Sequence, residues 1–391
     1  MKKIAIITSH PIQYNAPFFK QLAQNDVFKI KVFYTWGQSK SGSINDPDFN
    51  IKREWDIDLL DGYDYCFVEN TASDPGSHHF YGINNPSLIK TIESFKPDSL
   101  LVYGWSFKSH LAVIRYFKGS IPIIFRGDST LLDKFIGNFA ILKSFIRRLF
   151  LSWVYHYIDY ALFVGKSNYD YYMLMGLKKH QLLYGPHAID NQRFSSISHQ
   201  QKNEIEKWKF DLGIYNTDFV FLFVGKFENK KNPLLLIDAF KKLMHTSAKL
   251  IFIGDGVLFS NMKIAAQSDS RIKFLGFQNQ SKMPLVYRLG SVLILPSKGP
   301  NETWGLAINE AMASGLAVIA SDKCGGAIDL ITHNTGLIFE SNNQKALYNA
   351  MLHYINNQSI SISNGLNAQV YIQQFNYSES INSLQHLINK F

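Results

Sequence analysis

The stretch VLILPSKGPNETWGLAINE, from Val292 to Glu310, shows the sequence pattern on which the prediction of the fold class rests. It opens on four apolar residues, passes through a loop containing glycine and proline, and ends in the first part of a helical pattern that covers 306–314. A short continuous apolar run is typical of a strand buried on both faces, as in parallel sheets covered by helices. The stretch therefore predicts one strand-to-helix unit of an α/β domain.

The same alternation of apolar runs and helical patterns covers the rest of the chain. Strands are expected at 3–8, 29–34, 99–103, 122–125, 160–164, 219–224, 249–253, 272–274, 292–295 and 317–320. Helices are expected at 17–24, 86–95, 233–244 and 306–314. This alternation predicts two doubly wound α/β domains facing each other across a cleft, with ligands beyond the carboxyl ends of the strands.

The expected domain limits follow from composition. The segment 194–209 is polar and rich in Ser, Gln and Lys, so the first domain is assigned to 1–195 and the second to 196–372. The last segment, 373–391, has the pattern of an amphipathic helix.

Charge is spread unevenly along the 391 residues, whose formal net charge is +9. Acidic residues exceed basic ones by two over 1–99, whereas basic residues are in excess by seven over 100–195 and by four over 196–391. The basic middle block indicates an anionic partner, such as a nucleotide, a phospholipid surface or nucleic acid, or else a solvated basic face.

Cysteines and termini bear on the cellular compartment. Cys66 and Cys324 lie far apart and lack metal-ligand spacing, so both are expected to be reduced thiols in a cytosolic protein. The apolar run at 4–7 is short and precedes no small-residue cleavage site, which favours a first strand over a signal peptide. We expect no membrane-spanning helix, because no uncharged apolar stretch reaches about 18 residues.

Two carboxylates flank the loop that follows 292–295. Glu302 lies in the loop and Glu310 lies eight residues later, in the next helix. If the helix begins near Gly305, the N–H groups of Gly305, Leu306 and Ala307 form an anion site at its start. The alternative is structural, with Glu302 capping the helix and Glu310 on the surface.

A lysine-rich loop follows the strand at 219–224. Gly225 permits close approach of a ligand to the backbone, and Lys226 and Lys231 offer two ammonium groups to a pyrophosphate. Positive charge there would stabilise a leaving nucleoside diphosphate without a metal ion. The alternative is a solvated loop.

The second half resembles the donor domain of retaining family-4 glycosyltransferases with a GT-B fold. The matching segments, in chain order, are 221–226 (FLFVGK), 250–256 (LIFIGDG), 274–277 (FLGF), 296–297 (PS), 302–310 (ETWGLAINE), 310–315 (EAMASG) and 325–326 (GG).

The resemblance implies specific roles in binding a donor. Glu302 would contact hydroxyls of the transferred sugar, Glu310 the ribose, and Lys226 with Lys231 the diphosphate. The backbone around Phe277 and Gln278 would lie beside the nucleobase. The family usually has arginine where this chain has Lys226, so the bidentate contact is lost here.

In the first half the resemblance is weaker and points to an acceptor side. His10, in the loop after the first strand, is a candidate acceptor or sugar contact, or else a turn or capping histidine. Asp128 stands near where the family often has a histidine, and it would bind a sugar hydroxyl or act as a base. The alternative for Asp128 is an N-cap acid paired with Arg126. His187 replaces a typical asparagine and is assigned no chemistry.

The segment 134–153 combines apolar residues around a helix with Lys143, Arg147 and Arg148. Such a helix can lie on an anionic membrane, or it can be a core helix with a basic rim. Stacking platforms, zinc spacing and helix-turn-helix patterns are lacking, so nucleic acid is not expected.

The expected function is a retaining, metal-independent glycosyltransferase that needs no cofactor. The donor is a nucleotide sugar, a UDP-sugar being favoured over a GDP-sugar. The acceptor is a glycan or lipid-linked acceptor of bacterial surface polysaccharide synthesis. We expect the enzyme in the cytoplasm, either free or peripheral at the inner face of the cell membrane. A sugar-nucleotide epimerase and a silent nucleotide-sugar-binding partner remain alternatives. From the resemblance, helix 373–391 crosses back to the first domain.

Overall fold

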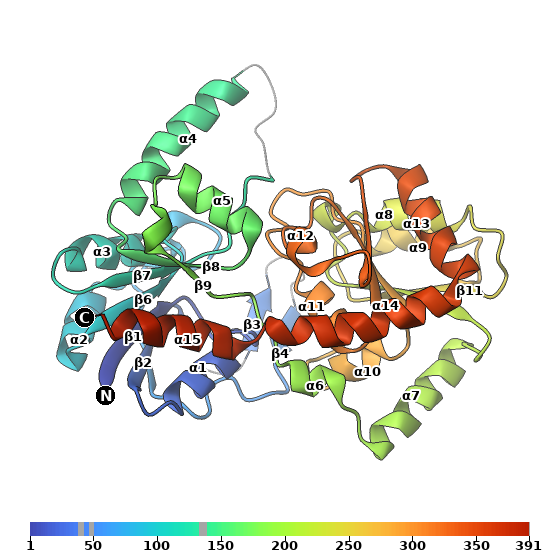
Figure 1. Cartoon of the computed structure of the whole chain (residues 1–391), viewed down its shortest axis with the longest axis horizontal. Coiled ribbons are helices and arrows are strands. Elements are labelled where there is room, and N and C mark those ends of the chain that lie inside the picture. The colour runs from blue at the N-terminus through green and yellow to red at the C-terminus, as the bar shows by residue number, and fades with distance from the viewer. Residues whose placement is uncertain (38–42, 47–50, 133–138, 391) are drawn as a thin grey trace. The chain divides into compact units, whose positions relative to one another are not determined.

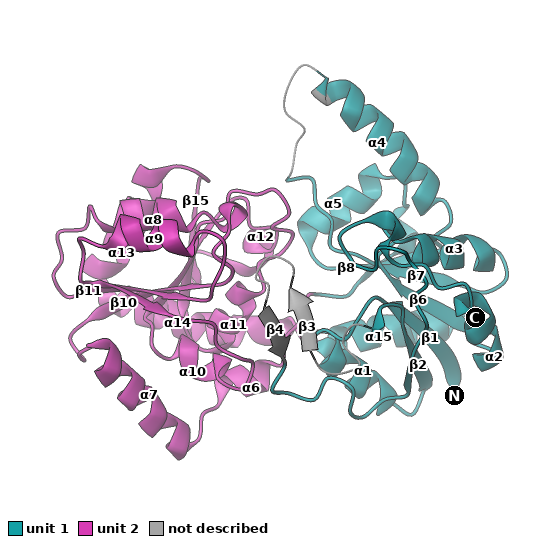
Figure 2. Ribbon diagram, turned by 180° about the vertical axis from the view of Figure 1, so that it is seen from behind, with its two compact units in different colours: residues 1–46, 50–186, 377–391 teal, residues 47–49, 187–376 magenta. Residues whose placement is uncertain are grey.

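The computed structural model describes residues 1–37, 43–46, 51–132 and 139–390. Within these residues the chain divides into two compact units (Figure 2). The first unit is built from the chain up to Pro186 and from the last segment, which starts at Tyr377; the second spans His187–Asn376.

The second unit is longer than expected at both ends, because residues 187–195 and 373–376 pack in it. Helix α6 (Asn191–Ser195) joins the second unit, where Phe194 is fully buried with its ring 5.9 Å from that of Tyr287. Arg288 donates hydrogen bonds to the carbonyls of Phe194 and Ser195, at 2.8 and 2.9 Å. The chain therefore enters the second unit before 196.

A seven-stranded parallel sheet forms the centre of the first unit, and most of its strands are labelled in Figure 1. The strand order is β5-β2-β1-β6-β7-β8-β9. Its strands are β1 (Lys2–Thr8), β2 (Phe28–Tyr34), β5 (Tyr65–Phe67), β6 (Ser99–Tyr103), β7 (Ile123–Arg126), β8 (Tyr160–Phe163) and β9 (Leu182–Tyr184). Its helices are α1 (Ala16–Ala23), α2 (Leu88–Phe95), α3 (Lys108–Phe117), α4 (Ala140–Tyr155), α5 (Lys166–Leu174) and α15 (Tyr377–Ile388), with 3-10 turns at Phe80–Gly82 and Lys179–Gln181. A separate antiparallel pair consists of β3 (Ser43–Asp46) and β4 (Ile51–Glu54).

Helix α15 belongs to the first unit although it follows the second in the chain. Gln385 donates to the side chain of Asn25 at 3.1 Å, and Ser383 donates to the carbonyl of Tyr184. Tyr377 packs on Phe18 of α1, with ring centroids 6.3 Å apart. Helix α15 thus packs against α1 and β9 of the first unit.

A six-stranded parallel sheet forms the centre of the second unit, in the order β12-β11-β10-β13-β14-β15. Its strands are β10 (Phe219–Val224), β11 (Ala248–Ile253), β12 (Ile272–Leu275), β13 (Val292–Leu295), β14 (Ala317–Ser321) and β15 (Gly336–Phe339). Besides α6, its helices are α7 (His199–Leu212), α8 (Pro233–Phe240), α9 (Phe259–Ala266), α10 (Met283–Tyr287), α11 (Ala307–Ala313), α12 (Ala327–Leu330), α13 (Gln344–Asn356) and α14 (Gln358–Tyr371), with 3-10 turns at Asn229–Lys231 and Ile372–Gln374.

Helices cover both faces of this second sheet. Helices α8, α9 and α13 lie over one face and α10, α11 and α14 over the other (Figure 2). Every residue of β10, β13 and β14 is buried, as expected for strands covered on both sides. All ten expected strands are present, and the prediction of two doubly wound α/β sheets is confirmed.

The strands that sequence reasoning missed are short and lie at sheet edges. They are β5, β9 and β15, each three or four residues long, together with the β3–β4 pair. An edge strand has a neighbour on one side only, and these segments lack the long apolar run of a central strand.

In both sheets the order in which successive strands are added reverses beside the first strand. In the first unit the chain passes from β1 to β2 on one side and then resumes at β6 on the other side of β1. In the second unit β11 and β13 likewise flank β10. These are topological switch points, where the loops after the two central strands diverge and leave room for a ligand.

Candidate functional site

The two loops with charged residues lie side by side at the switch point of the second sheet. One follows β10 and contains Gly225, Lys226 and Lys231; the other follows β13 and contains Glu302. The N–H of Lys298 in the second loop donates to the carbonyl of Lys230 in the first, at 2.8 Å. The sheet order therefore brings together residues about 70 positions apart in the sequence.

Glu302 and Lys231 form an ion pair in this location. Lys231 Nζ lies 2.6 Å from Glu302 Oε2, and the two side chains are 15% and 6% exposed. Ser297, which is fully buried, donates to the same oxygen at 3.1 Å. Glu302 stands four residues before Leu306, the N-cap of α11, and it contacts lysine and serine side chains. The capping alternative is therefore not the arrangement seen.

Glycines shape the Glu302 loop. Gly305 has φ +92°, and a Cβ there would lie 2.9 Å from Leu295 Cδ2. Gly325 donates its N–H to the carbonyl of Glu302 at 3.0 Å, and Gly326 donates to that of Trp304 at 2.9 Å. A Cβ on Gly326 would come within 2.8 Å of the Trp304 indole, so this position accepts only glycine without rearrangement. The loop holds Glu302 in place from two sides.

Glu310 points into the unit and away from solvent. It is 3% exposed, and its Oε2 accepts a 2.6 Å hydrogen bond from Tyr287, which is fully buried on α10. The surface alternative for Glu310 is therefore wrong. Tyr287 was missed in the sequence, where it is one of 20 tyrosines with no distinguishing neighbours.

Helix α11 begins near the position expected. Its first residue is Ala307 and its N-cap is Leu306, one residue beyond Gly305. The first N–H groups of a helix have no partner within it, so those of Gly305, Leu306 and Ala307 remain candidates for an anion. Because α11 has only seven residues, the ammonium groups nearby supply the larger positive charge.

The turn after β10 depends on a close approach of two strand ends. Gly225 has φ +149°, and a Cβ on Gly254, at the end of β11, would lie 2.1 Å from the Gly225 carbonyl oxygen. Lys226 is partly buried at this turn, and Lys231 closes the 3-10 turn Asn229–Lys231. Both lysines thus follow β10 directly, as expected.

Phe277 and Gln278 lie in the loop after β12, at the edge of the same sheet. Phe277 is 38% exposed, and Gln278 Nε2 donates to the carbonyl of Gly276 at 3.3 Å. Because β11 separates β12 from β10, this loop is offset sideways from the lysines, along the edge where the strands end.

Both cysteines are free thiols. Cys324 is buried beside the Glu302 loop, and burial together with the negative charge of Glu302 raises its pKa to about 12. Burial also raises the pKa of Cys66. Neither thiol is activated as a nucleophile, because thiolate formation is disfavoured at both positions.

In the first unit, His10 lies after β1 at the switch point of the first sheet. Its Nδ1 is 3.0 Å from Ser9 Oγ, and its ring meets Trp36 edge to face at 5.3 Å. Burial lowers its pKa to about 4, so the imidazole is neutral near pH 7. Helix α1 has Asn15 at its N-cap, so His10 does not cap it.

A second histidine at this edge was missed. His110 is fully buried, with Nε2 2.9 Å from Thr35 Oγ1 and Nδ1 3.1 Å from the carbonyl of Tyr103. Burial lowers its pKa to about 4 as well. His110 ties the loop after β2 to the loop after β6, and only the tertiary fold shows this link.

Asp128 lies in the loop after β7, which α5 holds in place. Tyr172 donates to the carbonyl of Gly127 at 2.8 Å, and Asn168 donates to that of Ser129 at the same distance. Arg126 donates to the carbonyls of Gly185 and Pro186, at 2.8 and 3.1 Å. Asp128 caps none of the described helices, since the next of these after it starts at Ala140.

The basic segment 134–153 is described in part. Residues 134–138 lie outside the described residues, while Lys143, Arg147 and Arg148 stand exposed on α4. His187 belongs to the second unit, with its ring 5.4 Å from that of Trp304, and its carbonyl accepts from Asn309. None of the helices in the described residues is both long and apolar enough to cross a bilayer.

Residues 204–371 match the family model described as "Glycosyl transferases group 1". This segment contains both charged loops of the second unit.

Two curated proteins show the extent of the similarity. The chain is 26% identical over 210 residues to the UDP-Gal:alpha-D-GlcNAc-diphosphoundecaprenol alpha-1,3-galactosyltransferase of Escherichia coli, over 52% of each chain. It is 27% identical over 195 residues to the D-inositol 3-phosphate glycosyltransferase of Corynebacterium glutamicum, over 47% of this chain and 46% of that one. The chain thus spans about half the length of the curated relatives it matches.

A solved structure covers the whole chain. Anabaena Alr3699/HepE in complex with UDP and glucose matches with a TM-score of 0.72 over 100% of both chains, at 18% identity. The likeness shows that the chain has the GT-B fold, which confirms the fold implied by the resemblance. The second unit is similar to the group 1 glycosyl transferases in sequence as well.

Proposed function

We propose that this chain is a retaining glycosyltransferase that moves a sugar from a nucleotide-sugar donor to a hydroxyl of a glycan, glycolipid or related acceptor. The observation that carries the proposal is the ion pair between the partly buried Lys231 and the buried Glu302, 2.6 Å apart at the switch point of the second sheet. It lies within the segment that matches the group 1 glycosyl transferases.

The donor would be held along the carboxyl edge of the second sheet. Lys226 and Lys231 would bind the diphosphate; one proton of the Lys231 ammonium faces Glu302, which leaves two for phosphate oxygens. Glu302 would accept hydrogen bonds from sugar hydroxyls and Glu310 from the ribose. The backbone at Phe277 and Gln278 would lie beside the base.

A UDP-sugar is the favoured donor, with a GDP-sugar as the alternative. The support comes from similar proteins: the Escherichia coli relative is named for UDP-Gal, and the Anabaena structure is a complex with UDP and glucose. A thermal-shift comparison of UDP, GDP and their common sugars would identify the donor, because a ligand that binds the folded state raises its stability.

The chemistry would be a front-face displacement. The acceptor oxygen forms a bond to the anomeric carbon while the bond from that carbon to the diphosphate breaks, through an oxocarbenium-like state. The acceptor proton passes to the departing diphosphate oxygen. The two lysines stabilise the charge that develops on the diphosphate, so the step needs neither a metal ion nor a cofactor.

Glu302→Gln tests the assignment. The variant keeps the shape of the side chain but removes the charge that pairs with Lys231, so transfer should fall at least about a hundredfold. The matched control is Glu206→Gln, an exposed acid on α7 that pairs with Lys209 at 3.0 Å. Near-normal turnover by a folded Glu302→Gln variant would contradict the role of Glu302 in transfer.

The acceptor would be bound by the first unit. His10 offers a neutral imidazole and Asp128 a carboxylate, suited to hydroxyl groups of an acceptor or sugar. Synthesis of bacterial surface polysaccharide on the cytoplasmic side is the setting we infer. Product analysis separates this reading from the epimerase alternative, which would yield an isomerised nucleotide sugar without an acceptor.

Helix α4 would attach the enzyme to the membrane as a peripheral contact. Its exposed side chains include Ile141 (88%), Phe145 (58%) and Leu149 (57%), beside three basic residues. The segment 139–155 contains no Asp or Glu. Apolar side chains flanked by cations alone match an anionic lipid surface, into which they insert while lysine and arginine contact the phosphates.

Vesicle sedimentation tests the membrane contact. Binding to vesicles with anionic lipid should fall about tenfold in Phe145→Ser, and also when Lys143, Arg147 and Arg148 become glutamine. Met244→Ser, which removes a side chain 91% exposed in the second unit, is the control and should bind normally. Equal binding by all three variants would refute the contact.

A further inference from the structure

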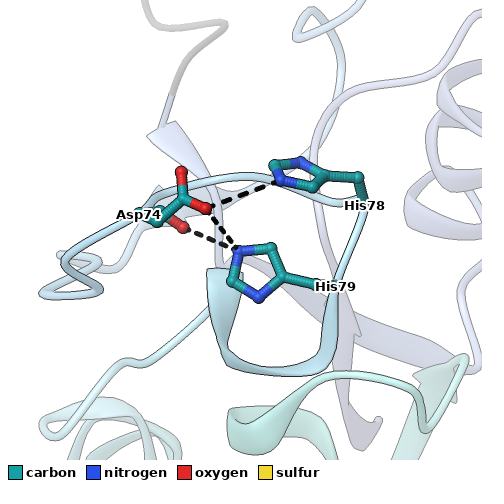
Figure 3. Close-up of side chains that lie close together, drawn as sticks. All are labelled: Asp74, His78 and His79. Atoms are coloured by element: carbon teal, nitrogen blue, oxygen red, sulfur yellow. Dashed lines mark hydrogen bonds and ion pairs between the residues drawn. The ribbon is translucent and has the colours of Figure 1, made fainter.

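A loop of the first unit brings together three side chains able to bind a metal ion. The loop lies between β5 and α2 and contains Asp74, His78 and His79 (Figure 3). One ligand atom from each residue lies within 4.8 Å of the other two. These residues take no part in the reaction proposed above.

The spacing of the ligand atoms fits a small tetrahedral ion. Asp74 Oδ2 lies 3.7 Å from His78 Nε2 and 3.3 Å from His79 Nε2. Metal–ligand bonds of about 2.0–2.1 Å in a tetrahedral site place neighbouring ligand atoms about 3.4 Å apart. His79 Nε2 also donates to the backbone carbonyl of Asp74 at 3.0 Å, a hydrogen bond that a metal ion bound at Nε2 would replace.

The loop is closed at its base by hydrogen bonds, which hold its ends together. Asn70 Oδ1 accepts from the N–H groups of Ala72 and Asn84, at 3.1 and 2.8 Å, and Asn70 Nδ2 donates to the carbonyl of Gly82 at 2.8 Å. The N–H of Gly76 also donates to the carbonyl of Gly82, at 3.0 Å. These hydrogen bonds hold together the two ends of the loop that contains Asp74, His78 and His79.

Gly76 makes room for one of the ligands. A Cβ on this buried glycine would lie 2.5 Å from both Cε1 and Nδ1 of His78, so the imidazole occupies the space that a side chain would fill. The ring of His79 lies next to it, with centroids 4.6 Å apart. An alanine at position 76 would therefore displace the His78 ring.

We propose that Asp74, His78 and His79 together bind one divalent transition-metal ion of the Zn²⁺ type, with water completing its coordination. Two imidazoles and one carboxylate favour such ions over Mg²⁺ and Ca²⁺, which prefer oxygen ligands. The side chains of Asp74 and His78 are 75% and 60% exposed, so an ion reaches them from solvent. Binding stabilises the first unit, because the unfolded chain lacks the site.

Titration of Zn²⁺ into untagged protein, freed of metal with EDTA, tests the proposal. Calorimetry should show one ion per chain, and the thermal midpoint should rise with Zn²⁺ but not with Mg²⁺. His78→Ala and His79→Ala should each abolish this binding, and Asp74→Asn should weaken it about tenfold or more. Gly76→Ala, which retains all three ligands, should weaken it as well.

His180→Ala is the matched control, since His180 is an exposed histidine of the same unit outside the loop. It should bind Zn²⁺ as the unchanged chain does. In EDTA all these variants should melt near the same temperature, which separates lost binding from lost folding. The proposal is overturned if the double variant H78A/H79A binds as much Zn²⁺ as the unchanged chain, or if His180→Ala loses as much as His79→Ala.

Discussion

The switch points of the two sheets share a topology and differ in their chemistry. In the second unit, charged side chains meet at this place: Lys231 with Glu302, and Glu310 held by Tyr287. In the first unit the corresponding place, around β1 and β6, holds His10 and His110, whose pKa values are both lowered to about 4. We call the first place the ionic edge (Lys231, Glu302 and Glu310) and the second the neutral edge (His10 and His110). The imidazoles of the neutral edge carry no charge near pH 7.

The difference follows from the free energy that is needed to remove a charged group from water. A buried charge requires a partner, which Glu302 has in Lys231, whereas a buried imidazole avoids the cost by losing its proton. Under the proposed function, the ionic edge faces the donor, whose leaving group is a dianion or more. The neutral edge suits the hydroxyl groups of an acceptor, which are uncharged and bind through hydrogen bonds.

The largest effect is expected from breaking the ionic edge. Lys231→Ala should lower kcat about 10²–10³-fold, because the diphosphate loses a donor in the transition state and the buried Glu302 loses its cationic partner. Lys230→Ala, a change at the neighbouring lysine that pairs with Glu228 at 3.4 Å, should have little effect. Steady-state kinetics with a saturating donor would measure both, and equal losses would contradict the distinction.

The neutral edge should show itself in the pH dependence of stability. His110 has a pKa near 4 when folded and near 6.5 when unfolded, so the unfolded chain binds more protons between these values. The free energy of unfolding should therefore fall by about 2 kcal/mol from pH 7 to pH 5 on account of this residue. Urea unfolding would measure it.

His110→Gln removes the titrating group while keeping a polar side chain. The variant is expected to be less stable at pH 7 but to lose less stability on acidification than the unchanged chain. The exposed His180→Gln serves for comparison and should retain the full pH dependence. If the free energy of unfolding falls equally in His110→Gln, groups other than His110 cause the acid sensitivity.

A smaller effect should follow from removing the hydrogen bond that Tyr287 donates to Glu310. Tyr287→Phe deletes the 2.6 Å hydrogen bond to its carboxylate, which should cost about 1–3 kcal/mol of stability and weaken nucleotide binding several-fold. In Tyr354→Phe, the hydroxyl lost is one that accepts from Asn364 at 2.9 Å in the same unit. This control should lower stability without changing nucleotide affinity, as calorimetry with UDP would show.

The smallest effect should come from strengthening the ionic edge. Lys226→Arg introduces a planar guanidinium that can bind a phosphate with two parallel hydrogen bonds. UDP affinity should rise by about threefold, as measured by calorimetry. Weaker binding would show that the turn after Gly225 accommodates only the lysine.

The central strands and the Lys231–Glu302 location could be predicted from the sequence because their signals are local. An apolar run of four to six residues marks a buried parallel strand, and a charged loop directly after it must lie at the carboxyl edge. The pairing itself depends on β10 and β13 being neighbours, which the alternation of strands and helices suggested but did not specify.

Tyr287 and His110 were missed for a physical reason. Each acquires its role from a partner far along the chain, Glu310 in one case and Thr35 in the other, and neither lies in a loop directly after a strand. The residues of α4 show a related limit: apolar side chains around a helix are compatible with a core or a lipid surface, and only their exposure distinguishes the two.

Helix α15 has a consequence for the order in which the protein is made. Ser383 reaches back 199 positions to the carbonyl of Tyr184, so the first unit lacks part of its own surface until Ser383 has been synthesised. Residues 187–376 are available to fold before then. We expect a chain that stops at Asn376 to be cut by protease first within the unit that was synthesised first, around α1 and β9, with the later-made unit surviving.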